Sequence, residues 1–523
     1  MMPGKKTILL ICSMVVITAS ASAKSSPVDL IKEYISALKA ADWKTAGKFW
    51  HPDFIARSKS LGITFDNVPV KFDCASNLFL SIEAIKSGQA NIDTITSAQY
   101  PEYTEIQLRL ANASDTVYDY YCFVPFNGEM KIVPRYYIHS KDWNTVQTGF
   151  TTIHYNNDSL INEYALERTD KFISDICNLL RIPKSRVAQL EQNKIDYYLC
   201  TEEEMRLLTG YNAHGLTNFQ FDAVITRHLP HQHELAHLLI NYALENVPLY
   251  TLPVFQEGFA VSSGGRWSKT PEVLMQLAYI MLDQGFVRID DLLGWDDFYK
   301  KAGPPELTYP AGGIFNRFIL YNYGIHIYKK LYLEFSGSEQ KLKLLTAPKV
   351  KRQITEICGS PWSKIESDFN TYISSFKSSG LNPGGDIPGS PPIITLNSED
   401  LTAQIWDNQN NYLFKIEWSG DNPDGAILIT TNKAITQDNY RSWMFSEQMP
   451  EADYNAERYG LVFNAKEAGL YDYYTNILMA KYVKAFIPSD SYISEDNKTI
   501  IFRLAKNKLK NNLNQYKLKL ISN

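Results

Sequence analysis

The feature that most constrains this chain is segment 233–237, with the sequence His-Glu-Leu-Ala-His. In a helix, this spacing places His233 and His237 one turn apart on the same face, so both imidazoles can reach one metal ion. Pro230 suits the first turn of such a helix. Apolar residues supply the face that it would bury: Leu235, Leu238, Leu239 and Tyr242. The segment therefore predicts a helix that presents two metal ligands.

A catalytic zinc site has three protein ligands and keeps its fourth position for water. A third ligand is therefore needed beyond the two histidines. Nineteen residues separate His237 from Glu257, which lies in the string Phe-Gln-Glu-Gly-Phe-Ala. This spacing and this string resemble the gluzincin (peptidase MA-like) zinc metallopeptidases, which include thermolysin and the zinc aminopeptidases. The resemblance implies that His233, His237 and Glu257 bind one Zn²⁺ per chain, with Glu257 on the following helix.

The resemblance extends over residues 143–377. It includes a strand–helix–strand lead-in, in which a strand is expected at 195–199, and an edge-strand candidate at 219–226 (FQFDAVIT) before the histidine motif. Tyr309-Pro-Ala-Gly resembles the Y-x-x-G helix start of the aminopeptidase branch. This match implies that Tyr309 hydrogen-bonds the developing oxyanion, although a buried tyrosine that caps a helix would fit the residue equally well. For Glu234 the resemblance implies the role of general base and then general acid.

Two departures limit the resemblance. Thermolysin-type sequences have an acidic residue one turn after the glutamate ligand, where this chain has Val261. Another group must then orient the metal-binding histidine. The amine-binding string G-x-M-E-N of the aminopeptidases is absent from the sequence, so exopeptidase action has no support. His228 and His231 flank the motif, and we interpret both as ordinary packing residues.

The N-terminus indicates export. Lys5 and Lys6 precede an apolar run, and Ala21-Ser22-Ala23 provides small residues where a signal peptidase cleaves. We therefore expect a signal peptide at 1–23 and a periplasmic, cell-surface or secreted protein. No later apolar run has the roughly 18 residues of a membrane helix, so we expect no transmembrane segment.

Composition excludes other classes. A net charge of -5 over 523 residues gives no electrostatic case for nucleic acid. Five cysteines follow the predicted signal peptide, and none forms a C-x-x-C pair. A cysteine metal site is therefore not expected, and either one disulfide (Cys177 with Cys200) or none fits the sequence.

The predicted fold class is a multidomain α+β chain. Residues 24–142 begin with helices and continue with alternating strands joined at Asn127-Gly128, a hairpin signal, and their start loosely resembles an NTF2-like domain. Residues 143–377 are the expected gluzincin (zincin-like) metallopeptidase domain. A Pro/Gly/Ser-rich linker at 378–392 separates them from an expected all-β sandwich at 393–523.

The leading hypothesis is an exported zinc metallopeptidase that hydrolyses a peptide or protein substrate. The alternative is a cell-surface binding or interaction protein whose zinc site is structural or vestigial. The intact Glu234 favours the enzyme, because a structural metal site does not need this residue. Substrate specificity and oligomeric state are not readable from the residues.

Overall fold

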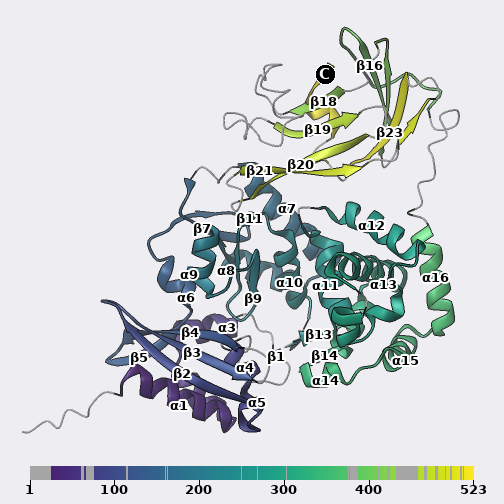
Figure 1. The fold of residues 1–523 in the computed structure, drawn as a ribbon. Helices are drawn as coiled ribbons and strands as arrows, with labels where there is room; N and C mark the ends of the chain where they lie inside the picture. Colours follow the sequence, from purple (N-terminus) through teal and green to yellow (C-terminus); the bar gives the residue numbers. More distant parts are fainter. Residues whose placement is uncertain are drawn as a thin grey trace, which may run out of the picture.

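The structure is a computed structural model that describes part of the chain. The residues that it describes are 25–60, 64–65, 73, 76–112, 116–158, 161, 163–244, 246–248, 250–267, 269–301, 303–337, 339–374, 376, 387–408, 411–420, 425–430, 457–463, 468–476, 481–488, 491–494, 498–506, 509 and 512–522. The expected signal peptide at 1–23 and most of the expected linker lie outside these residues. The described chain is mixed α+β, with several separate sheets (Figure 1), as the sequence predicts at this level.

The N-terminal region packs helices against an antiparallel sheet. Its helices are α1 (Pro27–Lys39), α2 (Trp43–Lys48), α3 (Pro52–Ser60), α4 (Asn77–Leu80), α5 (Ile82–Lys86) and α6 (Arg135–His139). The sheet runs β2 (Ala90–Gln99), β3 (Thr104–Asn112), β4 (Thr116–Phe126) and β5 (Glu129–Val133) in sequence order. Buried and partly exposed residues alternate along β3, so one face of the sheet packs against the core.

The turn between β4 and β5 is the one predicted at Asn127-Gly128. Both residues have positive φ, 48° and 81°, as a two-residue hairpin turn requires. The alternating pattern of the sequence runs from Met130 to Ile138, but strand β5 covers only Glu129–Val133. The strand ends at Val133, because Pro134 cannot donate to the ladder and instead precedes helix α6.

The middle region contains a five-stranded sheet in the order β6-β7-β8-β10-β9. Its strands are β6 (Asn144–Gln147), β7 (Thr151–Tyr155), β8 (Ile195–Leu199), β9 (Gly215–Asn218) and β10 (Ala223–Thr226). Strands β7, β8 and β10 are parallel, and β9 runs antiparallel to β10. The crossovers supply helices α7 (Glu163–Leu179), α8 (Lys184–Asn193) and α9 (Glu202–Thr209).

The edge strand differs from the sequence prediction. The segment 219–226 does not form the edge, because only Ala223–Thr226 is a strand and it lies between β8 and β9. The edge is β9, which the sequence analysis missed. Three of its four residues, Gly215, Thr217 and Asn218, are not apolar. The strand therefore has too little apolar alternation to be recognised in the sequence.

Helices dominate the rest of the middle region. They are α10 (Gln232–Tyr242), α11 (Pro253–Gly264), α12 (Pro271–Asp283), η2 (Ile289–Leu292), η3 (Asp297–Lys301), α13 (Pro305–Glu334), α14 (Glu339–Lys343), α15 (Ala347–Cys358) and α16 (Trp362–Ser374). Short bridging strands join them: β1 (Thr64–Phe65) pairs β12 (Asn246–Val247), and β13 (Tyr250–Thr251) pairs β14 (Ser336–Gly337). Helix α13 breaks at Gly324, whose φ of 79° is not helical.

The C-terminal region is built from strands in two sheets, drawn in green and yellow in Figure 1. One sheet is β15-β16-β17-β23-β22, with the bounds Ile394–Asn397, Leu401–Asn408, Asn411–Trp418, Thr499–Ala505 and Ser491–Ile493. The other contains β18 (Gly425–Thr430), β19 (Glu457–Phe463), β20 (Ala468–Asn476), β21 (Lys481–Pro488) and β24 (Lys517–Ser522), and β20 also pairs β11 (His228–Leu229). Phe414, Phe463 and Phe502 from both sheets share one buried core.

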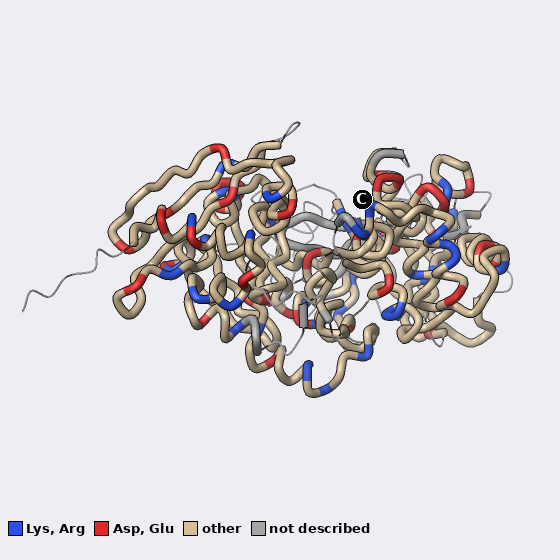
Figure 2. Tube along the Cα trace, turned by 90° about the horizontal axis from the view of Figure 1, so that it is seen from below, with Lys and Arg blue, Asp and Glu red and all other residues tan. Residues whose placement is uncertain are grey.

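The N-terminal and middle regions share a single buried core. At their boundary the Phe221 ring packs against Trp50 and Phe54, with centroids 5.7 and 5.2 Å away. Arg57 adds an ion pair to Asp196 at 2.9 Å. Charges of both signs are interspersed along the chain (Figure 2). Among the described residues, no helix combines the length and apolarity that crossing a membrane requires.

The described cysteines are unpaired. Cys122, Cys177, Cys200 and Cys358 are free thiols, and the first three are buried. Of the two alternatives that the sequence left open for Cys177 and Cys200, the structure has no disulfide between them. Cys177 lies in α7 and Cys200 follows β8, so each thiol packs as a small apolar group.

Candidate metal centre

Helix α10 carries the two histidines of the predicted motif. The helix begins at Gln232, so Pro230 lies before its first turn and not within it. Leu235, Leu238 and Leu239 are almost fully buried, which fixes the helix against the core with the histidines on its other side. The Nε2 atoms of His233 and His237 are 3.3 Å apart. Two nitrogen ligands thus converge from adjacent turns, as the spacing predicts.

Helix α11 brings Glu257 to the same point. The Oε2 atom of Glu257 lies 3.4 Å from His233 Nε2 and 3.7 Å from His237 Nε2. The next residue, Gly258, faces α13 at such close range that a Cβ there would lie 2.6 Å from the carbonyl oxygen of Gly312. A glycine after the glutamate therefore lets α11 pack deeply enough between its neighbours to reach the histidines.

These three atoms have the spacing of a tetrahedral metal site. Zinc–nitrogen and zinc–oxygen bonds of about 2.0–2.2 Å place two ligands of a tetrahedral ion about 3.3–3.6 Å apart. The observed separations of 3.3, 3.4 and 3.7 Å match this edge length closely. The donor set of two imidazoles and one carboxylate also suits zinc. The residues therefore fit the metal that the sequence resemblance implies.

Charge within the site holds the carboxylate ionised. Burial alone would raise the pKa of Glu257, but the two histidines beside it outweigh burial and hold this pKa well below its usual range. For His237, burial lowers the pKa and Glu257 raises it, and the net direction is upward. The carboxylate is thus in the charged form that metal ligation requires.

His233 is oriented by a backbone carbonyl. Its Nδ1 donates to the carbonyl oxygen of Gly265 at 2.8 Å, which leaves Nε2 as the ligand atom. The Gly265 carbonyl is therefore the group that orients this histidine, and an acidic side chain at position 261 is not needed for that purpose. The end of α11 approaches α10 closely, and a Cβ on Gly264 would lie 2.4 Å from the backbone of Gln232. Apart from the Gly264-Gly265 pair itself, no feature of the sequence points to this role.

Glu234 lies beside the metal ligands but is held by a different group. The Oγ1 of Thr217 donates to its Oε2 at 2.8 Å, and the same hydroxyl lies 2.9 Å from its backbone oxygen. Thr217 belongs to the edge strand β9. This hydrogen bond holds the Glu234 carboxylate against the edge strand β9. The carboxylate is not one of the three groups (His233, His237 and Glu257) that form the ligand triangle. The role of Thr217 could not be predicted from the sequence, because strand β9 itself was not predicted.

Arg266 adds a cation that the sequence did not indicate. Its Nη1 lies 3.0 Å from Glu257 Oε2 and 3.0 Å from His233 Nε2. The centre of its guanidinium is 4.0 Å from the Tyr309 ring centroid and 5.2 Å from that of Trp267. The side chain is thus clamped by two aromatic rings at the rim of the ligand triangle.

Tyr309 belongs to helix α13, and the guanidinium of Arg266 lies against its ring. The tyrosine is 8% exposed, and burial raises the pKa of its hydroxyl to about 12. Its ring contacts Phe298 and Trp267, with centroids 5.5 and 5.9 Å away. The structure therefore places Tyr309 next to the site, with the guanidinium between its ring and the metal-ligating atoms. The phenol remains protonated near neutral pH and able to donate a hydrogen bond.

His228 and His231 take packing positions close to the site. The Nδ1 of His231 lies 2.6 Å from Thr226 Oγ1, and its backbone nitrogen donates to the Tyr197 hydroxyl at 2.9 Å. Burial lowers the pKa of His228 to about 4 and that of His231 well below its usual range. Both rings are therefore neutral at physiological pH, in keeping with the interpretation made from the sequence.

A cleft of about 280 Å³ opens above the ligand triangle. Its walls come from β9, α10, α11 and the segment around β13, and its lining residues away from the metal ligands include Leu216, Phe219, Asn241, Pro248, Tyr250 and Gln256. Apart from Glu234, the ligands and Arg266, the lining residues of this cleft carry no charged side chain. The cleft is thus suited to an uncharged side chain of a bound substrate.

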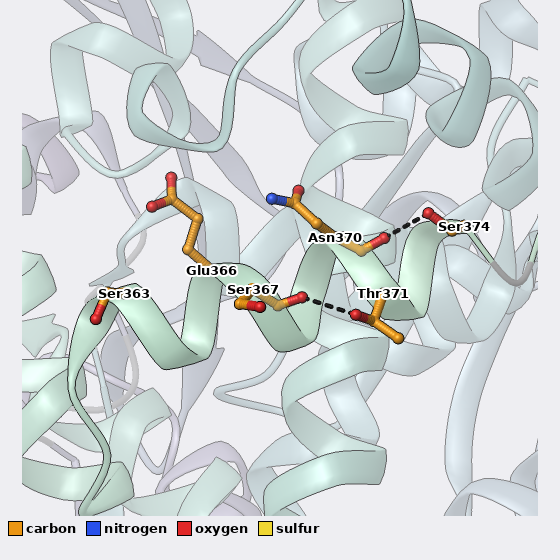
Figure 3. Close-up of a pocket in the computed structure, with 6 residues that line it drawn as sticks. All are labelled: Ser363, Glu366, Ser367, Asn370, Thr371 and Ser374. Atoms are coloured by element: carbon orange, nitrogen blue, oxygen red, sulfur yellow. Dashed lines mark hydrogen bonds between the residues drawn. The ribbon is translucent and has the colours of Figure 1, made fainter.

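Two other features of the described chain are weaker candidates. Glu105, Cys122 and His139 lie within 4.8 Å of one another, but Arg135 already pairs with both oxygens of Glu105, at 2.7 and 3.4 Å. A surface hollow of about 430 Å³ follows α16 (Figure 3). There the Thr371 and Ser374 hydroxyls donate to carbonyls within the helix. Neither feature gathers reactive groups as the cleft does.

Comparison with known proteins adds no relative, because no protein-family model and no curated protein matches this chain.

Proposed function

We propose that this chain is an exported, zinc-dependent metallopeptidase of the gluzincin type, which hydrolyses peptide bonds in a peptide or protein substrate. The observation that carries the proposal is the triangle of His233 Nε2, His237 Nε2 and Glu257 Oε2, whose edges of 3.3, 3.4 and 3.7 Å suit one tetrahedral zinc ion. Glu234 beside the triangle supports an enzyme rather than a structural metal site.

Each residue of the site has a proposed role. His233, His237 and Glu257 would hold the ion, and Gly265 fixes the His233 ring. Bound zinc lowers the pKa of its water ligand to about 7 and polarises a carbonyl group. Glu234 is the general base, because its carboxylate lies next to the ligands and Thr217 holds it in place.

The reaction adds one water across the peptide C–N bond. The oxygen of water bonds to the carbonyl carbon, and Glu234 accepts one of its protons. Glu234 then passes this proton to the leaving nitrogen as the C–N bond breaks. The products are a carboxylic acid and an amine, which become a carboxylate and an ammonium group when the second proton of the water passes to the amine, and Glu234 returns to its starting form.

The shape of the cleft supports an extended peptide as substrate. Gly215, Leu216 and Thr217 of β9 line the cleft. Strand β9 is the edge of its sheet, paired to β10 on one side. A peptide laid along its other side can pair with the strand backbone while its scissile carbonyl faces the ligand triangle. The uncharged lining would then accept an uncharged substrate side chain.

The domain architecture belongs to the same proposal. It consists of a signal peptide at 1–23, an NTF2-like domain at 24–142, the metallopeptidase domain at 143–377, a linker at 378–392 and a β-sandwich at 393–523. The antiparallel edge strand beside the histidine helix supports the gluzincin assignment. The two C-terminal sheets with a common core support the sandwich.

The test compares wild type with Glu234→Gln. Metal content is measured by mass spectrometry, and cleavage is measured on casein and a peptide library, with the exposed Glu203→Gln as a matched control. We expect one zinc per chain in all three proteins and cleavage by wild type and the control alone. Equal cleavage by Glu234→Gln overturns the assignment of Glu234. Zinc binding without cleavage of any substrate by wild type supports the binding protein instead.

A further inference from the structure

Arg266 contacts two of the three atoms that would bind the metal. Its Nη1 lies 3.0 Å from both His233 Nε2 and Glu257 Oε2, and these two atoms are themselves 3.4 Å apart. A zinc ion bonded to both at about 2.1 Å would lie no further than about 3.7 Å from that nitrogen, whatever its direction. A guanidinium does not lose its proton in proteins, so a divalent cation and a cationic group would face each other at contact distance.

The two cations are therefore alternative partners for Glu257. The conformation of Arg266 in the structure gives the buried carboxylate a counter-charge, and a metal ion would supply the same charge from nearly the same place. Because the repulsion at this range is strong, binding of the metal requires the guanidinium to turn away.

The surroundings of Arg266 define where it can turn. Its backbone is fixed by paired hydrogen bonds with Lys269, whose nitrogen and oxygen lie 2.9 and 3.1 Å from their Arg266 partners. Its guanidinium rests against the rings of Tyr309 and Trp267. A rotation of the side chain along these rings would keep the cation–π contact and would move the N–H donors off Glu257, toward the cleft that Arg266 lines.

We propose that Arg266 is a built-in counter-ion of Glu257 that the metal displaces, and that the displaced guanidinium then donates to the substrate's carbonyl oxygen in the cleft that Arg266 lines. The inference rests on the proposed function. A cationic donor next to the reacting carbonyl would stabilise the negative charge that develops there. Arg266 would also set the metal affinity, because each zinc ion must compete with an internal cation.

The first test measures metal affinity, independently of activity. Wild type, Arg266→Gln, Arg266→Lys and the control Arg288→Gln, which removes an exposed arginine, are stripped with a chelator and titrated with Zn²⁺ against a competing indicator. We expect the apparent Kd of Arg266→Gln to fall about tenfold or more below that of the control. Arg266→Lys, which retains the cation, should stay near wild type. Equal affinity in all four proteins overturns the inference.

The second test uses stability and kinetics. The metal-stripped Arg266→Gln should unfold at a lower temperature than the metal-stripped control, because Glu257 has lost its counter-charge, and zinc should abolish this difference. At saturating zinc its kcat should fall by about 10²–10³ with a smaller change in KM. An unchanged kcat overturns the role toward substrate.

The two proposals fail separately. If wild type and all its variants bind zinc without any cleavage, the peptidase assignment fails while the affinity difference still tests the counter-ion. If only Arg266→Gln binds zinc, the guanidinium stays beside Glu257 in wild type and blocks the metal. That result supports the counter-ion role, but it overturns the displacement of Arg266 by the metal and, with it, the hydrolase. If Arg266→Gln cleaves as wild type does and binds zinc equally, the inference fails and the hydrolase stands.

Discussion

The Nδ1 atom of His233 donates to the carbonyl oxygen of Gly265, and this single contact joins the two helices that carry the candidate metal ligands. Gly265 follows α11, which holds Glu257, whereas His233 belongs to α10. The backbone of one helix end therefore sets the ring orientation of a ligand on the other. The tautomer of His233 depends on it as well.

Removal of the Glu257 carboxylate, the proposed third ligand, should abolish tight metal binding. Glu257→Gln keeps the size of the side chain and removes the charge that zinc requires. We expect its apparent zinc Kd to rise by at least about a hundredfold. Loss of a residue that only hydrogen-bonds a metal ligand already weakens binding by up to about a hundredfold, and loss of a ligand itself should cost more. Titration of the metal-stripped protein with zinc measures this, and the exposed Glu306→Gln should bind as wild type does. Wild-type affinity in Glu257→Gln would exclude this residue from the ligand set.

Loss of the Thr217 hydroxyl should impair catalysis without loss of metal. Thr217→Val keeps the branched shape of the side chain but removes the hydrogen bond to Glu234. A hydrogen bond to a charged group contributes about 1.5–3 kcal/mol, so we expect kcat/KM to fall at least about tenfold. Thr217→Ser retains the hydroxyl and should keep most activity. Equal rates in the two variants, with equal zinc content, would show that Thr217 does not position the base.

A methyl group at Gly258 should separate α11 from α13. Its Cβ would lie 2.2 Å from Asn316 Nδ2 and 2.6 Å from the Gly312 oxygen, and the latter belongs to the backbone and cannot turn aside. Overpacking of this kind typically costs about 1–3 kcal/mol. We expect Gly258→Ala to lower the melting temperature by several degrees and to weaken zinc binding. Gly389→Ala, where a Cβ meets nothing within 4 Å, is the control and should leave both unchanged. A wild-type melting curve for Gly258→Ala would refute the close packing.

The buried Asp73 should make the N-terminal region less stable as the pH rises. Burial raises the pKa of Asp73 to about 8, although the hydroxyls of Tyr34 and Tyr121 donate to its Oδ2. In the unfolded chain its pKa is about 3.9. Between these values only the folded state holds the proton. This contribution is therefore complete below about pH 4 and is lost toward pH 8, by up to about 1.4 kcal/mol per pH unit.

The variant Asp73→Asn tests this dependence. Its amide oxygen can accept both tyrosine hydrogen bonds without a charge. Urea unfolding followed by tryptophan fluorescence at pH 5 and pH 8 should show a smaller loss of stability for Asp73→Asn than for wild type or for the exposed Asp53→Asn. If all three proteins lose the same stability, Asp73 is ionised in the folded state and the raised pKa is wrong.

Long elements with a clear period were readable from the sequence. The strand at 195–199 and the helix that carries His233 and His237 lie where the pattern predicts them, because each has one fully apolar face. The convergence of Glu257 on the histidines also followed from spacing and resemblance. Short or polar elements were missed. Strand β9 has no apolar alternation, and helix α6 follows a strand pattern that only Pro134 interrupts.

Groups that act through the backbone or through distant contacts left no signal. The carbonyl of Gly265 could not be predicted as the partner of His233, because any residue offers a carbonyl and only the fold determines which one arrives. Arg266 is one of many exposed-looking cations in the sequence, and its position against Tyr309 depends on the packing of α11 and α13. Such partners depend on three-dimensional proximity and not on a pattern of residue types.

The pairing of β11 with β20 gives the C-terminal region a mechanical connection to the candidate metal centre. His228 and Leu229 are the last paired residues before α10, and their partners, Asn476 and Thr475, belong to the β-rich region more than two hundred residues away. A displacement of that sheet would therefore act on the segment that leads into the histidine helix. A partner bound to the C-terminal strands would in this way reach the candidate metal centre from outside the cleft.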